Sequence, residues 1–552
     1  MTTRVHHINK RNGVTYVYES TSYWDKDKKQ PRNKQVCIGK LDPVSGELIL
    51  SKRFQKGYTA PVLCTLTPEP AASDVALTLP EVISQIPELI ASESVKTVRV
   101  ETVGPSIILD ALHQRLGLED ILKKCFPKIH HLIQLMAYYL VCEGGPLSHC
   151  ETWCKSHSPS LASLLASQRI SELLSALTFD AKQTFCKLWI QKVLETDYLC
   201  YDITSISSYA ESNEYVRYGH NRDLDPLPQL NLIVLFGQNN RLPVYYQKMP
   251  GSLTDVTTLP HLVKTFKALG VKSPSYIMDK GFYSKKNIDA LLLANHKFMV
   301  SVPLHNVFVK QVIDAVADTI HGINGYRTID DEVLYVHTQL YPWGENKKRC
   351  YLHLYYHAHK RAHAIDRFNK ELMGYKKELE DNRPNQSHQK AYDEFFIIKT
   401  TPKRGRTVSF NQDVIQKHIK VYTGFQAILC NNVKDPVEAL KIYRDKDVVE
   451  KCFDDLKNQL DIKRLRMHST PTMDGKLFVA FLALIYASAL RKEMRSSGLI
   501  KSYTTRELLQ EMKTLTKIKY TNTRKSLLTE MTKNQKEILQ KLSIQLPSIS
   551  KL

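Results

Sequence analysis

The stretch DYLCYDITS (197–205) combines the features of a buried β-strand with one carboxylate, Asp202, in its middle. Its apolar and β-branched neighbours are typical of a strand in a core. Two further β-runs follow at hairpin-like separations, LNLIVLFGQ (230–238) and RLPVYYQKMPG (241–251). A carboxylate in a strand core is costly unless it is paired or bound to a metal ion. The stretch therefore predicts a sheet strand that carries a functional acid.

The segments after these β-runs alternate between helix and strand. The pattern predicts a helix at 255–270, a strand SYIMD at 275–279, a helix at 284–295 and a strand KFMVSVP at 297–303. The order β-β-β-α-β-α-β is that of an RNase H-like core, in which crossovers add parallel strands to three antiparallel ones. We therefore predict an α/β fold whose chemistry lies at strand ends.

Changes of pattern divide the rest of the chain around this core. We expect a basic β-rich module at 1–58, a linker at 59–96, a helical and DNA-binding region at 97–195, the first part of the core at 196–304, a β-rich insertion at 305–423, the last core strand and catalytic helix at 424–499, and a basic helical tail at 500–552. Within the helical region, SQRISELLSAL (167–177) predicts a short helix, either one that enters a DNA groove or an ordinary packed one.

Composition points to a polyanionic partner. Lys and Arg number 77 against 56 Asp and Glu, a net charge of +21 with a pI near 9.3, and binding to phosphates releases condensed counterions. An ordinary basic protein is the alternative. Eleven scattered cysteines and the absence of an evident signal peptide or membrane span favour a cytoplasmic location. The apolar run at 477–490 predicts a buried helix.

In two clusters of potential metal ligands, the spacing of the side chains is only weak evidence for a metal site. HCETWCKSH (149–157) places Cys150 and Cys154 one helical turn apart, which allows a zinc site, but buried thiols are the more ordinary interpretation. The second cluster crosses an expected strand-to-helix boundary, so we favour solvated or DNA-facing histidines over metal ligands; it consists of His353, His357, His359 and His363.

Asp279 is the second candidate acid, because the cleavage of phosphodiesters requires carboxylates from more than one element. Such chemistry uses two divalent ions about 3.5–4 Å apart, and Mg²⁺ prefers carboxylate oxygens from different elements. Asp279 ends the strand SYIMD, and Gly281 permits a tight turn after it. A single Asp at a strand end is most often a helix N-cap. Asp279 alone is therefore weak evidence for a functional acid, and it becomes a candidate only together with Asp202. Asp197 and Asp289 are less suitably placed.

The charged stretch YRDKDVVEKCFDDLK (443–457) supplies the third acid. At 100° per residue, one face spanning about 60° carries Tyr443, Lys446, Glu450 and Lys457. An apolar stripe of Val449, Phe453, Leu456 and Leu460 lies beside it. We therefore expect Glu450 at the border of the core, and we expect the other charges to be solvated, including Arg444, Asp445 and Asp455. A surface helix with ion pairs is the alternative.

These motifs together resemble those of DDE-type insertion-sequence transposases with the Y-R-E-K signature, Y-x2-R-x3-E-x6-K. Tyr443, Lys446, Glu450 and Lys457 have that spacing, with Lys in place of Arg. That substitution keeps the charge and loses the bidentate fork. Further similar segments are YDITS, DKGFYS, YGHNRD (218–223), MPGSLTD (249–255) and LRMHSTPTMDGKLFVAFLALI (465–485), whereas LDPLPQ departs from the family's pattern. The N-terminal WDKDKKQPRNKQVCIGKLDP resembles the branch with a long β-rich insertion.

The resemblance implies cut-and-paste movement of a bacterial insertion sequence by a retroviral integrase-like catalytic core. Asp202, Asp279 and Glu450 would bind two Mg²⁺ ions, for which Mn²⁺ can substitute. The partners would be terminal inverted repeats and target DNA, bound by a homodimer. The implied DNA-binding residues are Tyr443, Lys446, Lys457, Lys280, Arg222 and Trp343, the last either stacking on a flipped base or packing in a turn.

Two other functions share these features. An RNase H-like nuclease without strand transfer would carry the same acids. A non-catalytic DNA-binding protein derived from a transposase would not need three carboxylates in such positions.

Overall fold

The computed structural model consists of two compact units, 1–92 and 93–552. It describes residues 2–8, 15–25, 30–42, 48–50, 98–194, 198–210, 213–221, 223, 225–271, 274–401, 405–460, 462–467, 469–520 and 526–545. The first unit is an antiparallel sheet in the order β1 (Thr2–Ile8), β2 (Thr15–Asp25), β3 (Gln30–Leu41) and β4 (Leu48–Leu50). The expected linker at 59–96 lies outside the described residues.

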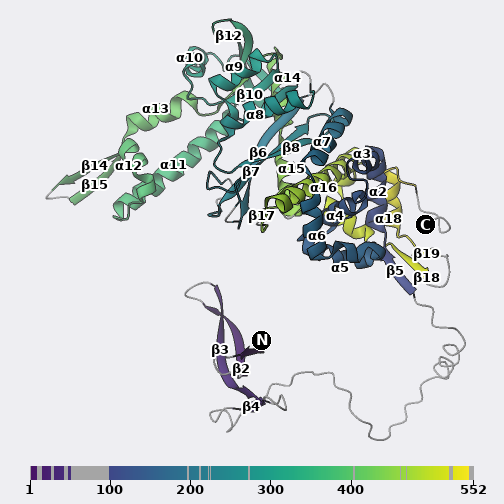
Figure 1. Ribbon diagram of the computed structural model, residues 1–552. Helices are drawn as coiled ribbons and strands as arrows, with labels where there is room; N and C mark the ends of the chain where they lie inside the picture. The colour runs from purple at the N-terminus through teal and green to yellow at the C-terminus, as the bar shows by residue number, and fades with distance from the viewer. Residues whose placement is uncertain are drawn as a thin grey trace, which may run out of the picture. The chain divides into compact units, whose positions relative to one another are not determined.

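The second unit is built on one large mixed sheet (Figure 1). The five strands of the predicted core are adjacent in the order β8-β7-β6-β9-β10. Their bounds are β6 Tyr198–Ser208, β7 Gln229–Gly237, β8 Pro243–Pro250, β9 Ser275–Met278 and β10 Lys297–Val302. β6, β7 and β8 pair antiparallel, whereas β9 is parallel to both β6 and β10. The predicted β-β-β-α-β-α-β order and mixed α/β class are therefore confirmed.

Opposite faces of β6 meet different helices. Tyr201 is hydrogen-bonded to Thr258 of α8 (Asp255–Ala268), with 2.6 Å between the hydroxyl oxygens. Successive strand residues point to opposite faces, so Asp202 faces away from α8. α15 (Asp447–Asp454) packs against β6 and β7. The crossover after β9 contains α9 (Lys285–Leu293).

One long buried helix joins the sheet to the helical region. α16 (Thr470–Ser496) packs on β8 and on helices of 97–195. It is long and apolar enough to cross a membrane, but 94% of its most apolar window is buried inside the protein. This confirms the buried helix predicted at 477–490.

The helical region surrounds α16. It comprises α2 Gly104–Leu116, α3 Leu118–Cys125, α4 His130–Glu143, α5 Cys150–His157, α6 Ser167–Ala176 and α7 Phe179–Val193. A Cβ atom added to Gly475 of α16 would lie 2.3 Å from the Leu174 carbonyl oxygen of α6, so the two backbones are in close contact. The helix predicted at 167–177 therefore packs on α16 through one face, on which Ile170 and Leu174 are buried, while most of its other residues are exposed.

The C-terminal tail is not helical throughout, contrary to the prediction. It contains α17 (Thr505–Met512), β18 (Thr516–Tyr520), β19 (Ser526–Leu528) and α18 (Lys533–Lys541). β18 pairs antiparallel with β5 (Val98–Thr102) as well as with β19. The sequence TKIKY alternates polar and apolar residues, and a partner strand about four hundred residues earlier in the chain makes this strand favourable.

The range predicted as an insertion, 305–423, divides into two structural parts. After α10 (Val307–Val316), its first strands, β11, β12 and β13, extend the main sheet beyond β16, which is the predicted last core strand and lies next to β10. These strands are β11 Tyr326–Ile329, β12 Glu332–Trp343, β13 Lys348–Tyr356 and β16 Phe425–Cys430. They therefore belong to the sheet rather than to a separate domain.

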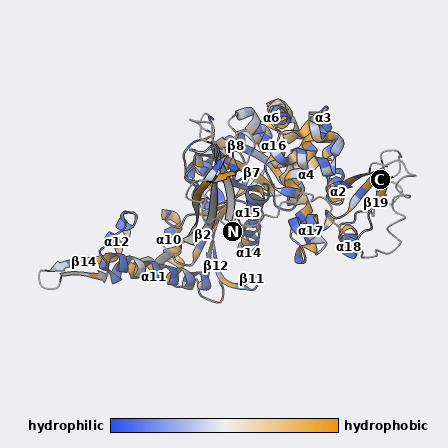
Figure 2. Ribbon diagram, turned by 90° about the horizontal axis from the view of Figure 1, so that it is seen from below, coloured by the Kyte–Doolittle hydropathy of each residue, from blue (hydrophilic) through white to orange (hydrophobic). Residues whose placement is uncertain are grey.

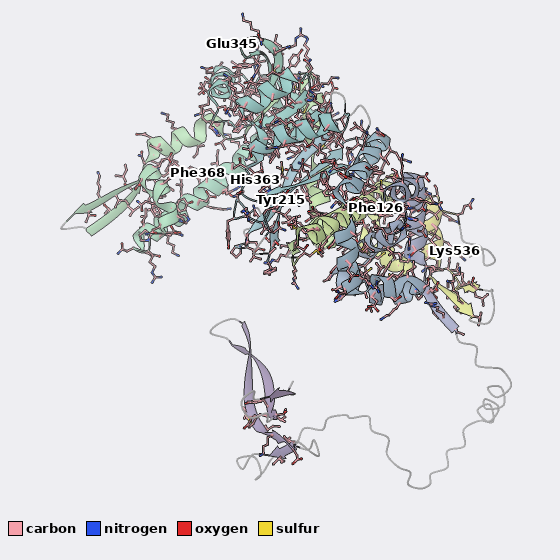
Figure 3. The ribbon with its side chains drawn as sticks, viewed as in Figure 1. Phe126, Tyr215, Glu345, His363, Phe368 and Lys536 are labelled. Carbon is pink, nitrogen blue, oxygen red and sulfur yellow. The ribbon has the colours of Figure 1, made fainter. Side chains whose placement is uncertain are left out.

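The second part of this range is a lobe that extends from the sheet along α11 (Figure 1). It consists of α11 Ala358–Glu380, α12 Gln389–Phe395, β14 Phe396–Thr401, β15 Gly405–Phe410 and α13 Gln412–Tyr422. A small core of its own includes Leu372, Tyr392 and Phe396. Figure 2 shows that α11 is mostly hydrophilic, and Figure 3 shows Phe368 and His363 on this helix.

A buried ion pair attaches the segment after α15 to α16. After α15 the backbone forms a π-helical segment, Asp455–Gln459. Asp455 is only 3% exposed, and both of its carboxylate oxygens accept hydrogen bonds from Arg491 of α16. Burial raises the pKa of Asp455, while Arg491 opposes that rise. The expectation that Asp455 is solvated is therefore wrong, because its partner lies 36 residues away on another helix.

We predict that Arg491→Ala lowers the free energy of unfolding by about 3–5 kcal/mol, because it leaves a buried carboxylate without its partner. Thermal unfolding of the full-length protein, followed by circular dichroism, measures the loss. The double variant Asp455→Ala/Arg491→Ala is the control and should lose less than Arg491→Ala. An Arg491→Ala protein as stable as the wild type would contradict a stabilising role of this pair.

Candidate active site

The register of two parallel strands brings the first two acids together. The last residue pair between β6 and β9 is Tyr201 with Met278. The next residue of each strand is an aspartate, so Asp202 and Asp279 lie side by side at the point where β9 ends. Residues paired across parallel strands share a face, and this face of β6 is the one that meets α15.

The two aspartates differ in exposure. Asp202 is 6% exposed, and its Oδ1 accepts a hydrogen bond from the amide of Ile203 at 2.8 Å. Asp279 is half-exposed and begins a short turn at Lys280. In that turn a Cβ atom on Gly281 would lie 2.9 Å from Oδ2 of Asp255, so the absence of a side chain keeps the turn close to α8. Asp202 is thus fixed by the strand, whereas Asp279 is accessible from outside.

The third acid comes from a helix that is interrupted just before it. α14 (Pro436–Arg444) ends before Lys446, and α15 begins at Asp447. Across this break the Lys446 amide donates to the Tyr443 carbonyl oxygen at 3.2 Å. The predicted apolar stripe of Val449, Phe453, Leu456 and Leu460 is buried, as expected. Glu450 lies beside that stripe, and 62% of its side chain is exposed.

Lys446 connects the acids through one buried ammonium group. Its Nζ lies 3.8 Å from Oδ1 of Asp279 and 3.8 Å from Oε1 of Glu450. The side chain of Lys446 is only 7% exposed. A lysine is rarely buried this far unless it is paired with acids. Lys446 therefore holds Glu450 and Asp279 around a common positive charge.

Tyr443 adds a hydrogen-bond donor to this group. Its hydroxyl donates to Oδ1 of Asp279 at 3.2 Å. Burial raises the pKa of Tyr443, and the negative charge of Asp279 raises it further, so the hydroxyl keeps its proton. Ser301 of β10 is also hydrogen-bonded to this tyrosine. Ser301 could not be identified from the sequence. It is recognised only because the pairing of β10 with β9 places it beside Asp279.

The donor chemistry of the three acids fits a divalent metal ion. Asp202, Asp279 and Glu450 provide hard carboxylate oxygens from two strands and one helix, as Mg²⁺ prefers. The ammonium group of Lys446 lies between two of them. In the part of the chain that the structure describes, no three His, Cys, Asp or Glu side chains are grouped closely enough to hold an ion. Metal binding therefore requires the exposed Glu450 side chain to turn towards the aspartates.

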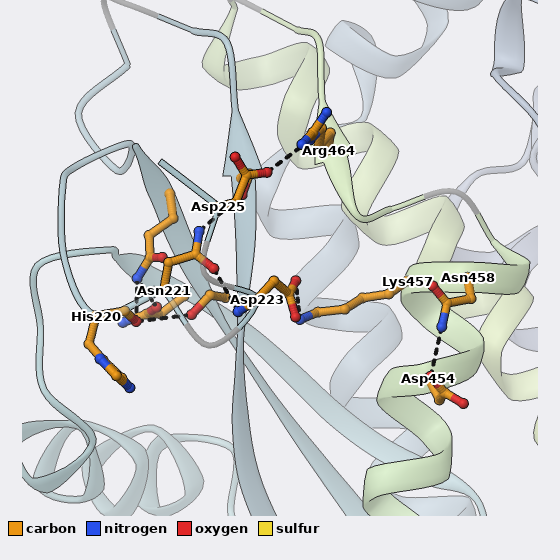
Figure 4. A network of polar contacts seen from close by, with 12 residues as sticks. His220, Asn221, Asp223, Asp225, Asp454, Lys457, Asn458 and Arg464 are labelled. Carbon is orange, nitrogen blue, oxygen red and sulfur yellow. Dashed lines mark hydrogen bonds and ion pairs between the residues drawn. The ribbon is translucent and has the colours of Figure 1, made fainter. Parts of the chain in front are cut away.

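Lys457 lies within the π-helical segment and has a partner other than the three acids. Its Nζ donates to Oδ2 of Asp223 at 2.7 Å, which attaches the loop after β6 to the catalytic helix (Figure 4). Asn221 stabilises the same loop by accepting from the Asp223 amide at 2.9 Å. Asp223 was not identified as a partner, although it belongs to the YGHNRD motif. Arg222 lies outside the described residues, and Lys280 is exposed directly after Asp279.

Other charges near the cluster have ion-pair or hydrogen-bond partners, although the side chain of Asp445 is also 46% exposed, as expected. Arg444 is ion-paired with Glu332 of β12. Asp445 accepts a hydrogen bond from Nε2 of Gln238 at 2.9 Å and lies 3.8 Å from Arg241. These partners come from β12 and from the turn between β7 and β8, so periodicity within the helix gives no sign of them.

Trp343 is buried beside the sheet, and its ring is not available for stacking on a DNA base. It is 6% exposed, and its Nε1 donates to Oδ1 of Asp289 at 2.7 Å. Phe308 meets the indole edge-to-face, with 5.9 Å between ring centroids. The expectation of a DNA contact by Trp343 is therefore replaced by the packing alternative.

The histidine cluster is split between core and surface. His353 and His357 are fully buried, and burial lowers the pKa of each. His353 is hydrogen-bonded to Thr338 and to the Val433 carbonyl oxygen. The expectation of solvated histidines is thus wrong for these two, whereas His359 and His363 are exposed on α11.

The cysteine cluster consists of buried thiols, the more ordinary of the two interpretations of its sequence. Cys150 and Cys154 are both buried on α5. The ring of His157 stacks on Trp153, with 4.1 Å between centroids. Among the described residues no zinc-binding group includes these side chains.

One of three comparisons with known proteins identifies a family for this chain. The family model of the transposase DDE domain matches residues 196–486, just over half of the chain. A solved structure, the cryo-EM structure of piggyBac transposase synaptic complex with hairpin DNA, is similar at 11% sequence identity and a TM-score of 0.33, over 65% of this chain and 58% of that chain. So weak a likeness bears on neither fold nor activity. No curated protein matches the sequence. Because the family model matches more than half of the chain, this chain belongs to the family of proteins that carry the transposase DDE domain.

Proposed function

We propose that this protein is a DNA transposase that binds the terminal inverted repeats of an insertion sequence, cleaves at its ends and joins the freed 3′-OH ends to target DNA. The observation that carries the proposal is the placement of Asp279 and Glu450 around Lys446, with Asp202 beside Asp279 on the neighbouring strand, within a transposase DDE domain. The alternative of a nuclease without strand transfer shares these acids and is separated from the proposal by the products of the reaction.

The strand order supports an RNase H-like core. In that fold the central strand carries the first acid and its parallel neighbour ends at the second. β6 and β9 have this relation, and β7 and β8 complete the antiparallel side. Helix α15 then provides the third acid across the face of β6.

Asp202, Asp279 and Glu450 would hold the divalent ions, which we propose to be two Mg²⁺, with Mn²⁺ able to substitute. When bound, these ions supply charge stabilisation at the attacking and leaving oxygens of phosphoryl transfer. The exposed carboxylates of Asp279 and Glu450 are open to a DNA strand, whereas the buried Asp202 fixes the floor of the site.

Lys446 and Tyr443 would orient the scissile phosphate. The ammonium group of Lys446 is a compact point charge, so it neutralises a phosphate oxygen without the two-pronged contact of an arginine. The Tyr443 hydroxyl keeps its proton and can donate to the same group. Lys280 stands exposed one residue after Asp279 and would contact the adjoining backbone.

The partners follow from charge and from the reaction. A net charge of +21 favours DNA as the partner. Joining two ends requires them to be held together, so we propose a homodimer in the synaptic complex. The helical region at 97–195 would add DNA contacts, and the protein would act in the cytoplasm, on the nucleoid.

We predict that Asp202→Asn, Asp279→Asn and Glu450→Gln each abolish Mg²⁺-dependent cleavage of DNA that carries the element's ends, because each removes a ligand charge. DNA affinity should stay within about twofold of the wild type, since phosphate contacts by cations dominate binding. Gel assays of cleavage and strand transfer, with binding measured in parallel, give both quantities.

Asp454→Asn is the matched control for the acids. Asp454 is an exposed aspartate on α15, where it accepts a hydrogen bond from Asn458 at 2.7 Å. This variant should cleave as the wild type does. Cleavage retained by any of the three acid variants would remove that residue from the site, and cleavage without joined products would favour the nuclease.

We predict that Lys457→Ala weakens DNA binding and lowers the salt dependence of the affinity by about one charge. The reason is that the Lys457 ammonium, held by Asp223, can exchange that partner for a phosphate. Asp223→Asn should therefore strengthen binding. Lys541→Ala, on α18 and paired with Glu537, is the control. An unchanged salt slope for Lys457→Ala would assign the pair with Asp223 a purely structural role.

A further inference from the structure

A cavity with a strongly basic lining lies next to the catalytic helix and contains none of the three acids. Its volume is about 220 Å³, and its walls come from the α14–α15 junction, the β7–β8 turn and the C-terminal half of α16. Its cationic side chains are Arg241, Arg444, Lys451, Arg491, Lys492 and Arg495. Asp445 and Asp447 are the acids in the lining, so cations outnumber acids by six to two. Such an excess in a concave site favours an anion.

Two of these arginines are fixed in place by acids outside the cavity. Arg491 is held by the buried Asp455, and Arg444 is held by Glu332. Ion pairs of this kind fix the guanidinium groups before any ligand arrives, which lowers the entropy lost on binding. The buried Ser488 side chain of α16 also lines the cavity and adds a hydroxyl.

The remaining charge is not balanced within the protein. In the described part of the chain, Lys451, Lys492 and Arg495 have no ion-pair partner within 4.0 Å. Burial lowers the pKa of Arg495, and the nearby charges of Arg241 and Arg491 lower it further. Cations that crowd one another in this way would be stabilised by an anion placed between them.

We propose that this cavity binds one phosphate group of the DNA backbone and anchors the duplex beside the active site. Its volume is below the roughly 300–1,000 Å³ typical of pockets for drug-sized ligands, so a single phosphate group fits better than a whole nucleotide. Lys451 of the cavity directly follows Glu450 of the active site, so one short helix, α15, links the two. The inference rests on the proposed function in one respect, namely that DNA is the source of the phosphate.

The double variant Lys492→Gln/Arg495→Gln tests this inference. Both side chains are exposed and lack ion pairs, so thermal unfolding should match the wild type. Fluorescence anisotropy with a labelled DNA duplex at several salt concentrations measures the affinity. We expect the Kd to rise roughly tenfold, the loss of about one charged hydrogen bond. The slope of log affinity against log salt should fall by about 0.9, the value for one phosphate.

The control Lys155→Gln/Lys541→Gln removes two lysines on α5 and α18, each paired with a glutamate one turn earlier on its own helix. If the Lys492/Arg495 variant binds the duplex with the same Kd and salt slope as this control, the inference is wrong. A second arm measures the rise in melting temperature with inorganic phosphate against chloride at equal ionic strength. A rise that the variant loses while its DNA affinity is unchanged would assign the cavity to free phosphate and overturn the proposal. A wild-type protein that binds the duplex but joins no DNA ends would refute the proposed function and leave this site standing.

Discussion

The parallel pairing of β6 with β9 is the constraint on which the site depends. The strands run in register up to Tyr201 and Met278, and the next position on each is an aspartate. Parallel pairing needs a crossover, which α8 and the strands before it supply. Since a shift by one residue would turn Asp202 to the opposite face, the position of the acid is set by the packing of the whole sheet.

The buried ammonium group of Lys446 links Glu450 of α15 to Asp279 at the end of β9. Lys446 brings its ammonium group within 3.8 Å of both Asp279 and Glu450, although these acids come from a strand end and a separate helix. Without an opposing charge, carboxylates this close would repel one another and favour protonation. The break between α14 and α15 positions this lysine, and the Asp455–Arg491 pair fixes the following segment to α16. The catalytic helix is thus held at both ends by charge.

The sequence was informative where the signal is local. Strand order, the buried helix at 477–490 and the apolar stripe of α15 could be predicted, because alternation and periodicity report burial directly. That Asp202 and Asp279 share one site was implied only by the family resemblance. Contacts between distant segments could not. The pairing of Asp455 with Arg491, the burial of Trp343 beside Asp289 and the pairing of TKIKY with β5 depend on tertiary packing. The pairing of Lys457 with Asp223 was missed because the loop after β6 is distant in the sequence.

The central claim is that Asp202, Asp279 and Glu450 form one divalent-metal site. Crystals of the full-length protein soaked in Mn²⁺, with anomalous diffraction recorded at the manganese edge, test it most directly. We expect anomalous density within coordinating distance of all three carboxylates, with the Lys446 ammonium moved away from Glu450. Manganese bound only elsewhere, or no density at these residues at a saturating concentration, would contradict it.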